Sequence, residues 1–538
     1  MNATGDTFDF IVVGAGTSGC VLANRLTARG DVTVALLEAG PADRSPWLKI
    51  PIGFSRTFRD PKVNWCFETT PQESLGGRRI FWPRGKVLGG SSSINGMIHI
   101  RGHPEDFDAW ASAGLEDWSW QRVLPYFRRA EGQLCDMGDV YGSDGPIAIS
   151  ELPVRNGATA AFVDSAVNAG LPRVRTFNTD TQEGAGNFQI NTRHGLRDSA
   201  ASAYLRPARA RPNLTVLTHA HVTRIDVREG RAVGVHWMTA GQSTYLAARR
   251  GVILAAGAVG SPAILQLSGI GDPVDLGRAG VGVVHASPLV GKNLQDHFGT
   301  RYIARLSRPI TVNDDFRRPW RLAQHALRYA LSRSGQIAIG GAEAGAFARS
   351  SEREMRPDLQ FHFLPLSNER AGWSFHPFSG VTANICQLRP FSRGTVRIAS
   401  ADPMQPPDID PRYLDDPRDG AALVAGLRLA RRIFATAPLR DLVAQEHSPG
   451  AGIETDDEIL AHVRAHGSTV FHPVGTCAMG MSRDSPLDAE CRVRGLAGLR
   501  VVDASSMPSI VSGNTNAAVL MLAERMAERI GASLDRLA

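Results

Sequence analysis

The sequence predicts an α/β fold in which a parallel sheet has helices on its faces, and two observations near its start carry that prediction. An apolar run from Phe8 to Val13 leads into a glycine-rich turn at residues 14–19, and a helix-like stretch follows. A second apolar run, Val32 to Leu37, comes after that stretch. Strand-like and helix-like segments that alternate in this order are typical of a parallel sheet.

The turn at residues 14–19 has the glycine spacing of a dinucleotide cradle. Gly14 permits the tight turn, Gly16 lets the backbone approach a pyrophosphate, and Gly19 lets the helix pack closely on the strand. Glu38 follows the second apolar run, at the distance where a carboxylate accepts hydrogen bonds from an adenosine ribose. By itself this unit leaves open whether NAD, NADP or FAD is bound.

The composition is that of a globular enzyme with more than one domain. The chain has 538 residues, of which 43% are hydrophobic and 21% charged. Its net charge of +6 comes from dispersed basic residues without a nucleic-acid motif, so no nucleic-acid partner is expected. The six cysteines form no C-x-x-C pair, which argues against a disulfide framework or a metal site and favours a reducing compartment.

No segment of the sequence has the pattern of a signal peptide, and no apolar run reaches the ~18 residues of a membrane-spanning helix. We therefore expect a cytoplasmic protein. One segment, Arg317 to Arg333, carries five arginines and no acids, interleaved with large apolar residues. It favours a surface helix near the pocket mouth, with a docking face for the inner membrane as the alternative.

The later part of the chain predicts further elements. Residues 84–95 combine glycines and hydroxyl side chains, which offer backbone N–H groups to an extended polar ligand. Residues 300–465 read as a separate unit, with a strand at Leu359–Leu364 and a helix at Gly420–Ala435. The chain closes with a strand at Leu499–Ala504 and an amphipathic helix at Ala517–Ile530, which we expect to return to the first sheet. Short strands are predicted between these regions, at residues 214–217, 221–227, 232–237 and 251–255.

Several blocks along the chain resemble the glucose–methanol–choline (GMC) oxidoreductases, flavoproteins that hold FAD and oxidise alcohols. The resemblance runs from about residue 8 to residue 530, and it is greatest to bacterial choline-dehydrogenase-like alcohol dehydrogenases, including those for aliphatic primary alcohols. The blocks that carry it are Gly85–Asn95, Gly257–Gly271, Phe471–Gly480 and Ser512–Asn516, with smaller ones at 291–297, 392–396 and 410–414.

The resemblance implies an α/β (α+β overall) fold with two domains. A Rossmann-like FAD-binding domain of GMC type is expected to be discontinuous, and a substrate-binding domain is expected to have a mixed or antiparallel sheet with flanking helices. The implied ranges are 1–155, 211–299 and 466–538 for the FAD-binding domain, and 156–210 and 300–465 for the substrate-binding domain.

The resemblance also implies which residues hold the cofactor. Ile94 occupies the place where some choline-oxidising members have a histidine bonded to FAD, so the flavin is expected to be non-covalent. By matching position the pyrophosphate would lie against Gly14, Gly16, Thr17, Ser18 and Gly19, and the adenosine against Glu38, Ala39 and the backbone of Val222. The flavin side would contact Gly90, Ser91, Asn95, Asp503, Ala504 and Thr515.

Alcohol oxidation requires a base for the hydroxyl proton, and histidine has the suitable pKa. His472 matches the family's catalytic histidine and is our candidate. Asn516 is expected as the second active-site residue, which would bind the alcohol oxygen, while Asn514 would cap the last helix. Electrons are expected to pass to a quinone or an artificial acceptor. The alternatives are a sorbose-type sugar dehydrogenase, an oxygen-using oxidase and, more remotely, a lyase on the same scaffold.

Three other positions bear on the substrate. His362 alternates with two phenylalanines on a strand, and packing within the sheet is favoured over a place in the pocket. His99 and Ala478 stand where relatives have other residues, an aromatic residue or alanine and an arginine respectively. Both departures leave the shape of the substrate open, as the sequence leaves open the oligomeric state.

Overall fold

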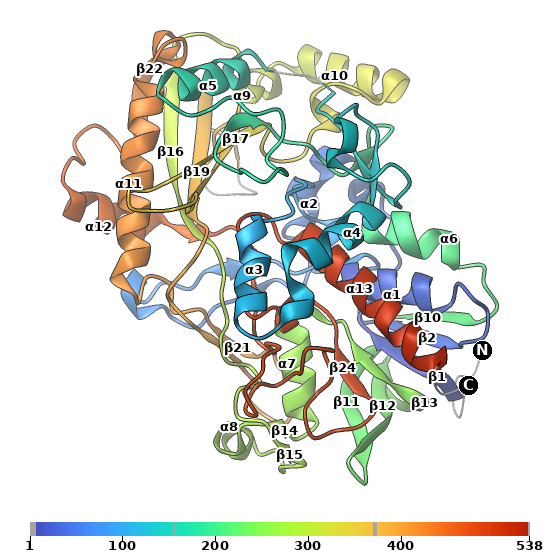
Figure 1. The fold of residues 1–538 in the computed structure, drawn as a ribbon. Helices are drawn as coiled ribbons and strands as arrows, with labels where there is room; N and C mark the ends of the chain where they lie inside the picture. Colours follow the sequence, from blue (N-terminus) through green and yellow to red (C-terminus); the bar gives the residue numbers. More distant parts are fainter. Residues whose placement is uncertain (1–6, 154–155, 370–373, 536–538) are drawn as a thin grey trace.

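The computed structural model describes residues 7–153, 156–369 and 374–535 and contains two seven-stranded sheets. The first lies in the lower right of Figure 1 and the second in the upper left. Helix α13 (Asn516–Asp535), near the end of the chain, crosses the centre of the view, and both termini lie at the lower right, beside β1 (Thr7–Val13) of the first sheet.

The first sheet has the order β10-β2-β1-β13-β12-β11, and β24 also pairs with β13. Strands β10, β2, β1, β13 and β24 run parallel, while β11 and β12 add antiparallel pairs beside β13. This arrangement confirms the predicted α/β fold and the return of the closing strand. The strands are β1 (Thr7–Val13), β2 (Val34–Glu38), β10 (Leu214–Thr218), β11 (His221–Arg228), β12 (Arg231–Thr239), β13 (Gln242–Leu254) and β24 (Leu499–Val501).

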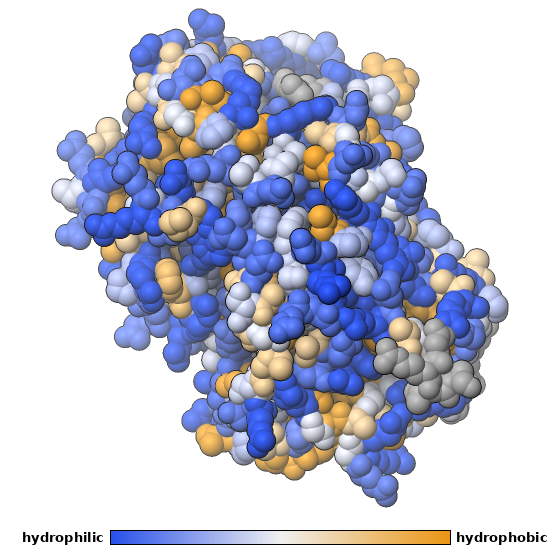
Figure 2. Space-filling view, viewed as in Figure 1, coloured by the Kyte–Doolittle hydropathy of each residue, from blue (hydrophilic) through white to orange (hydrophobic). Residues whose placement is uncertain are grey.

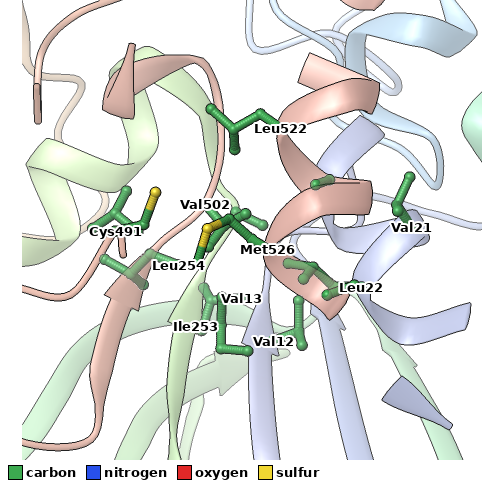
Figure 3. Close-up of a cluster of buried hydrophobic side chains, with 14 of the residues drawn as sticks. Val12, Val13, Val21, Leu22, Ile253, Leu254, Cys491, Val502, Leu522 and Met526 are labelled. Atoms are coloured by element: carbon green, nitrogen blue, oxygen red, sulfur yellow. The ribbon is translucent and has the colours of Figure 1, made fainter. Parts of the chain in front are cut away.

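Helices α1 (Thr17–Leu26) and α13 pack together against this sheet and fix the position of the glycine-rich turn. Each large aliphatic side chain buried between them contributes about 1.5–3 kcal/mol. Because α1 begins directly after the turn, this packing holds the helix N-terminus in place. Figure 3 shows the contact, in which the buried side chains include Val12, Val13, Leu22, Leu254, Leu522 and Met526.

The second sheet is antiparallel, with the order β22-β16-β19-β18-β17-β7 and β23 paired to β16. The strand predicted at Leu359–Leu364 is confirmed as β18, and the helix predicted at 420–435 is α11 (Pro417–Phe434). Phe361 and Phe363 of β18 pack under α5 (Gly157–Asn168) and α11. The other strands are β7 (Gly184–Asn187), β16 (Phe298–Leu306), β17 (Ala344–Ala348), β19 (Gly380–Gln387), β22 (Val443–Ser448) and β23 (Ser468–Thr469).

Smaller elements connect and cover the two sheets. No helix among the described residues is long and apolar enough to cross a membrane. All six cysteines are free thiols, and no cluster of metal-ligating side chains occurs in the described ranges. The remaining helices are α2 (Phe54–Thr57), α3 (Pro104–Ser112), α4 (Trp120–Ala130), α6 (Arg206–Ala208), α7 (Gly257–Leu267), α8 (Pro273–Arg278), α9 (Val312–Phe316), α10 (Pro319–Ser332) and α12 (Asp456–His466). The short strands are β3 (Phe67–Glu68), β4 (Phe81–Trp82), β5 (Glu131–Gln133), β6 (Ile147–Ile149), β8 (Thr192–Arg193), β9 (Leu196–Arg197), β14 (Ile270–Gly271), β15 (His285–Ala286), β20 (Thr395–Arg397) and β21 (Asp408–Asp410).

Candidate active site

A cavity of about 1440 Å³ is lined by residues from both sheets. Of the sixteen predicted cofactor and catalytic residues, fifteen line this cavity and only Gly19 does not, so the predicted set converges on one place. Gly19 lies outside the lining. A Cβ there would stand 1.9 Å from the carbonyl oxygen of Gly14, so a glycine at this position lets α1 pack on the turn.

The glycine-rich turn leaves no room for side chains at the places where a cofactor would pass. Gly14 has a φ of +97°, and a Cβ on it would lie 2.7 Å from the carbonyl oxygen of Ala255. A Cβ on Gly90 would lie 2.7 Å from the Cα of Gly16. The turn at 14–16 and the segment at 90 therefore approach each other through backbone alone.

Two polar groups at this end of the cavity fit a dinucleotide. The Ser18 hydroxyl is buried and has no hydrogen-bond partner among the described residues, as expected of a group that contacts a bound phosphate. Glu38 accepts hydrogen bonds from the backbone N–H groups of Ala15 (3.0 Å) and Gly40 (2.9 Å), and burial raises the pKa of its carboxyl to about 7. Each of its oxygens retains a lone pair for a ribose hydroxyl.

The first residues of α1, α7 and α13 all line the cavity, so the positive ends of three helix dipoles face it. Asp503 holds α7 in this position, since it accepts hydrogen bonds from the Gly257 N–H (2.9 Å) and the Ser261 hydroxyl (2.6 Å). Helix N-termini favour negative charge, such as that of a pyrophosphate. The donor set of this cavity therefore fits FAD.

A chain of hydrogen bonds fixes the proton positions on His472. The Nε2 of His297 lies 2.9 Å from the carbonyl oxygen of Leu388, which can only accept, so Nε2 of His297 carries the hydrogen. Burial lowers the pKa of His297 to about 3, so its Nδ1 is bare. Since Nδ1 of His472 lies 3.0 Å from that atom, His472 donates from Nδ1 and its Nε2 is unprotonated.

The surroundings of His472 keep it neutral. Burial, followed by the nearby His297 and His362, lowers its pKa well below 6.5. Its backbone N–H donates to Asp296 (2.7 Å), whose carboxylate also accepts from the hydroxyls of Tyr413 and Thr469. The backbone and the ring of His472 are thus each held by a separate partner, which leaves Nε2 free to act as a base.

The structure corrects the expected places of the two asparagines. Nδ2 of Asn514, the residue expected to cap the helix, lies 3.1 Å from Nε2 of His472. Asn516, expected beside the substrate, is the first residue of α13 and accepts a hydrogen bond from the Thr17 hydroxyl (2.8 Å). Gln360 donates to Oδ1 of Asn514 (3.2 Å) and thereby orients its amide. The partner of His472 is therefore Asn514, while Asn516 ties α13 to the cofactor cradle.

The structure also places the other three positions, and it corrects the expectation for His362. His362 lines the cavity, because its phenylalanine neighbours occupy the opposite face of the sheet under the helices. His99 is buried in the core, where its Nε2 lies 3.1 Å from Glu131, and neither it nor Ala478 belongs to the cavity wall.

His297 is the functional residue that the sequence reasoning missed. It lies in the block at 291–297, which carried part of the family resemblance, but no role was expected for it. Its position just before β16 places it under the loop that carries His472. The only signal in the sequence is that His297 follows Asp296. That pair does not reveal that His297 contacts His472, which lies 175 residues further along the chain.

Comparisons with known proteins agree with this site. Two sequence profiles, both described as GMC oxidoreductase, match residues 8–299 and 390–523. The chain is 42% identical to an alcohol dehydrogenase [acceptor] of Pseudomonas putida, over 98% of this chain and 96% of the relative. It is 40% identical to an oxygen-dependent choline dehydrogenase of Vibrio vulnificus, over 97% and 94% of the two chains.

Solved structures resemble the fold over nearly the whole chain. Pyridoxine 4-oxidase of Mesorbium loti matches with a TM-score of 0.88 at 30% identity, over 97% of this chain and 99% of that one. A formate oxidase matches with a TM-score of 0.91 at 27% identity, over 99% of this chain and 100% of that one. The chain therefore belongs to the GMC oxidoreductase family and is an FAD-dependent oxidoreductase that acts on CH–OH donors.

Proposed function

We propose that this enzyme oxidises a primary alcohol, aliphatic or aromatic, to the aldehyde, with His472 as the general base and a quinone or artificial compound as the final electron acceptor. The observation that supports this most is the unprotonated Nε2 of His472, held by the His297 contact in the cavity that fits FAD. An alcohol hydroxyl placed at this nitrogen has an acceptor for its proton.

The base is needed because the alcohol proton is hard to remove. With an alcohol pKa near ~16, like that of water, ionisation at pH 7 costs about 12 kcal/mol, that is, about nine pKa units at ~1.4 kcal/mol each. A base within hydrogen-bond reach lowers this cost by taking the proton as the C–H bond breaks. When bound, FAD supplies the acceptor for the carbinol hydrogen and its electron pair, so the proton and the two electrons leave to different acceptors.

Asn514 positions the substrate in this proposal. Its Nδ2 now donates to Nε2 of His472, and an alcohol oxygen that enters between them can accept from Asn514 while it donates to His472. Gln360 keeps the amide in the donating orientation. The residue thus contributes orientation of the reacting carbon and leaves proton transfer to the histidine.

We further propose that the cofactor is non-covalent and that the parts of the chain expected as the FAD-binding domain hold it. The lining residues Gly14, Gly16, Thr17, Ser18, Glu38, Ala39, Gly90, Ser91, Asn95, Val222, Asp503, Ala504 and Thr515 support this assignment. Ile94, which also lines the cavity, has no nucleophilic atom with which to bond the flavin.

A peripheral membrane contact through α10 also remains a proposal. Along this helix Trp320, Leu327 and Leu331 are 57%, 60% and 79% exposed, and their spacing puts them in one stripe. Arginines lie beside the stripe, which suits an anionic lipid surface. Figure 2 shows apolar surface at the place of α10 in the upper right. Flotation with anionic liposomes at low salt tests the contact, and a protein that stays unbound refutes it.

The experiment that tests the reaction is anaerobic mixing of the FAD-loaded enzyme with aliphatic alcohols, benzylic alcohols, choline and sorbose, with the flavin absorbance as the readout. Bleaching by primary alcohols is expected. Reoxidation with oxygen or a quinone analogue then separates an oxidase from a dehydrogenase. A flavin that stays oxidised with every compound would contradict the proposed function and favour a non-redox role.

A further inference from the structure

The wall of the cavity that belongs to the second sheet carries a row of polar side chains. In the strand register Arg301 of β16 lies opposite Asn384 of β19, and Asn384 lies opposite His362 of β18. Residues directly opposite each other in antiparallel strands share a face, and all three line the cavity. The neighbouring row on the same face is more apolar and includes Ile303 and Leu364.

One end of this row adjoins the catalytic pair. His362 is only 7% exposed, and its Nδ1 has no partner in the described part of the chain. Burial lowers the pKa of His362 to about 4, and a hydrogen bond to Asn514 opposes this shift, which places the ring beside that residue. His362 is therefore a neutral imidazole next to Asn514, with one buried ring nitrogen that is available to a polar ligand atom.

The other end is a cation without an anionic partner. Nη1 of Arg301 donates to the carbonyl oxygen of Glu369 (2.8 Å), and Nη2 donates to the carbonyl oxygen (2.7 Å) and the side-chain oxygen (2.8 Å) of Asn368. No carboxylate in the described ranges forms an ion pair with it. Burial, unopposed by any nearby acid, lowers the pKa of Arg301 to about 10.

Arg301 is partly buried, and an ion withdrawn from water is stabilised by a counter-ion that offsets its lost hydration. A ligand that enters the cavity with a negative charge would supply that counter-ion. Arg101 provides a contrast within the chain, because it is more fully buried than Arg301 and donates to both oxygens of Glu131. Glu343, a buried carboxylate on the same cavity wall, forms no ion pair with Arg301. It accepts from the Thr159 hydroxyl (2.7 Å), and burial raises its pKa, which weakens it as a site for a cation.

We propose that the substrate is an alcohol that carries a carboxylate at its far end, with the carboxylate bound by Arg301 and the hydroxyl at His472. This rests on the proposed function. Two strand spacings of about 4.8 Å separate His362 from Arg301, so the two ends lie about 10 Å apart. At ~1.2 Å per bond an extended chain of about eight bonds spans this distance. An ω-hydroxy acid of medium length fits, with its methylene groups along Ile303 and Leu364.

The same charge works against a cationic alcohol. With its hydroxyl at His472, choline would hold its ammonium group in the same cavity but several Å short of Arg301, and like charges repel more strongly in a low-dielectric cavity than in water. The row thus predicts an order of preference in which the hydroxy acid comes first, an uncharged alcohol of the same length second, and choline last.

The test compares 8-hydroxyoctanoate, its methyl ester, 1-octanol and choline as reductants of the FAD-loaded enzyme under anaerobic conditions. The second-order rate constant for 8-hydroxyoctanoate is expected to exceed that for the ester by about 10- to 100-fold, the contribution of a hydrogen bond to a charged group. Arg301→Met is expected to bring this ratio close to one, and Arg301→Lys to retain part of it. Arg305→Met, on the same strand but exposed, is the matched control and keeps the ratio.

The outcomes separate the two proposals. If no alcohol reduces the wild-type flavin, the proposed function itself fails. If 1-octanol reduces it while the acid has no advantage over the ester, or if Arg301→Met keeps the advantage, the carboxylate assignment is wrong and the reaction stands. The flavin content shows whether each variant is folded. If Arg301→Met does not hold FAD, the Arg301→Lys variant decides instead. An unchanged ratio of acid to ester in Arg301→Lys, together with a preference for choline, would refute the assignment.

Discussion

Replacing His297 by leucine tests whether the proton positions in the active site are set from behind the base. In the wild type, Nδ1–H of His472 donates to Nδ1 of His297 at 3.0 Å. Leucine has a similar volume but no acceptor, so the buried N–H of His472 would lose its partner. An unsatisfied buried donor costs about 1–3 kcal/mol, which His472 avoids by moving its hydrogen to Nε2. That tautomer cannot accept a proton from the alcohol.

The expected result follows from this cost. Only the minor tautomer of His472 would remain active in His297→Leu, so the limiting rate of anaerobic flavin reduction should fall by about 5- to 150-fold. His297→Gln is the matched variant, because its side-chain oxygen can accept from His472 while its amide donates to the carbonyl of Leu388. Partial rescue by glutamine is expected, and the assay is stopped-flow absorbance of the flavin at saturating alcohol.

A double-mutant cycle separates this role from a structural one. If His297 acts through His472, then His297→Leu should have little further effect in a His472→Ala background, where no base remains to be oriented. A full additional loss in that background would refute the reasoning. So would an unchanged rate in His297→Leu with intact FAD content.

Four further results are expected. His472→Ala should keep FAD and slow its reduction by at least ~100-fold, as measured by stopped-flow, since a general base contributes about that much. Asn514→Ala should slow reduction by about 10-fold or more, whereas Asn516→Ala should chiefly weaken FAD retention, measured by the flavin-to-protein ratio after gel filtration, because it loses the contact with Thr17. Because burial lowers the pKa of His472 well below 6.5 and the neutral form is the active one, the reduction rate should stay constant through neutral pH and fall only at lower pH; an inflection above pH 7 would contradict this. Acid precipitation should release all the flavin into the supernatant, and flavin absorbance that stays with the pellet would show a covalent bond.

The cofactor end of the site could be predicted from the sequence because its signals are local. The turn at 14–19 follows a strand and opens a helix, and the steric demands at Gly14 and Gly19 arise from residues of that same unit or its partner strand. The strand at Leu359–Leu364 was predictable for the same reason, since its alternation is visible over six residues. Local pattern suffices where the neighbours along the chain are also the neighbours in space.

The reactive end could not be read in the same way. Asn514 and Asn516 are two residues apart before a helix, and which of them faces His472 depends on how α13 docks on α1 and on the Gln360 contact from another sheet. The alternation with Phe361 and Phe363 predicts that His362 lies on the opposite face of the strand from the two phenylalanines. It does not predict which of the two faces lines the cavity. The face can be assigned only from the positions of α5 and α11, which cover the two phenylalanines.

The second sheet contributes to both substrate binding and the state of the base through a single strand. His297 immediately precedes β16, and Arg301 lies four residues further along it, about 13 Å away in extended backbone. The carbonyl of Leu388, which fixes the hydrogen on His297, comes directly after β19, the strand that carries Asn384. A movement of β16 and β19 relative to the first sheet would therefore alter the contact between His297 and His472 together with the row that holds the substrate. For this reason the chemistry at His472 and the choice of alcohol are expected to change together in variants that loosen the packing between the sheets.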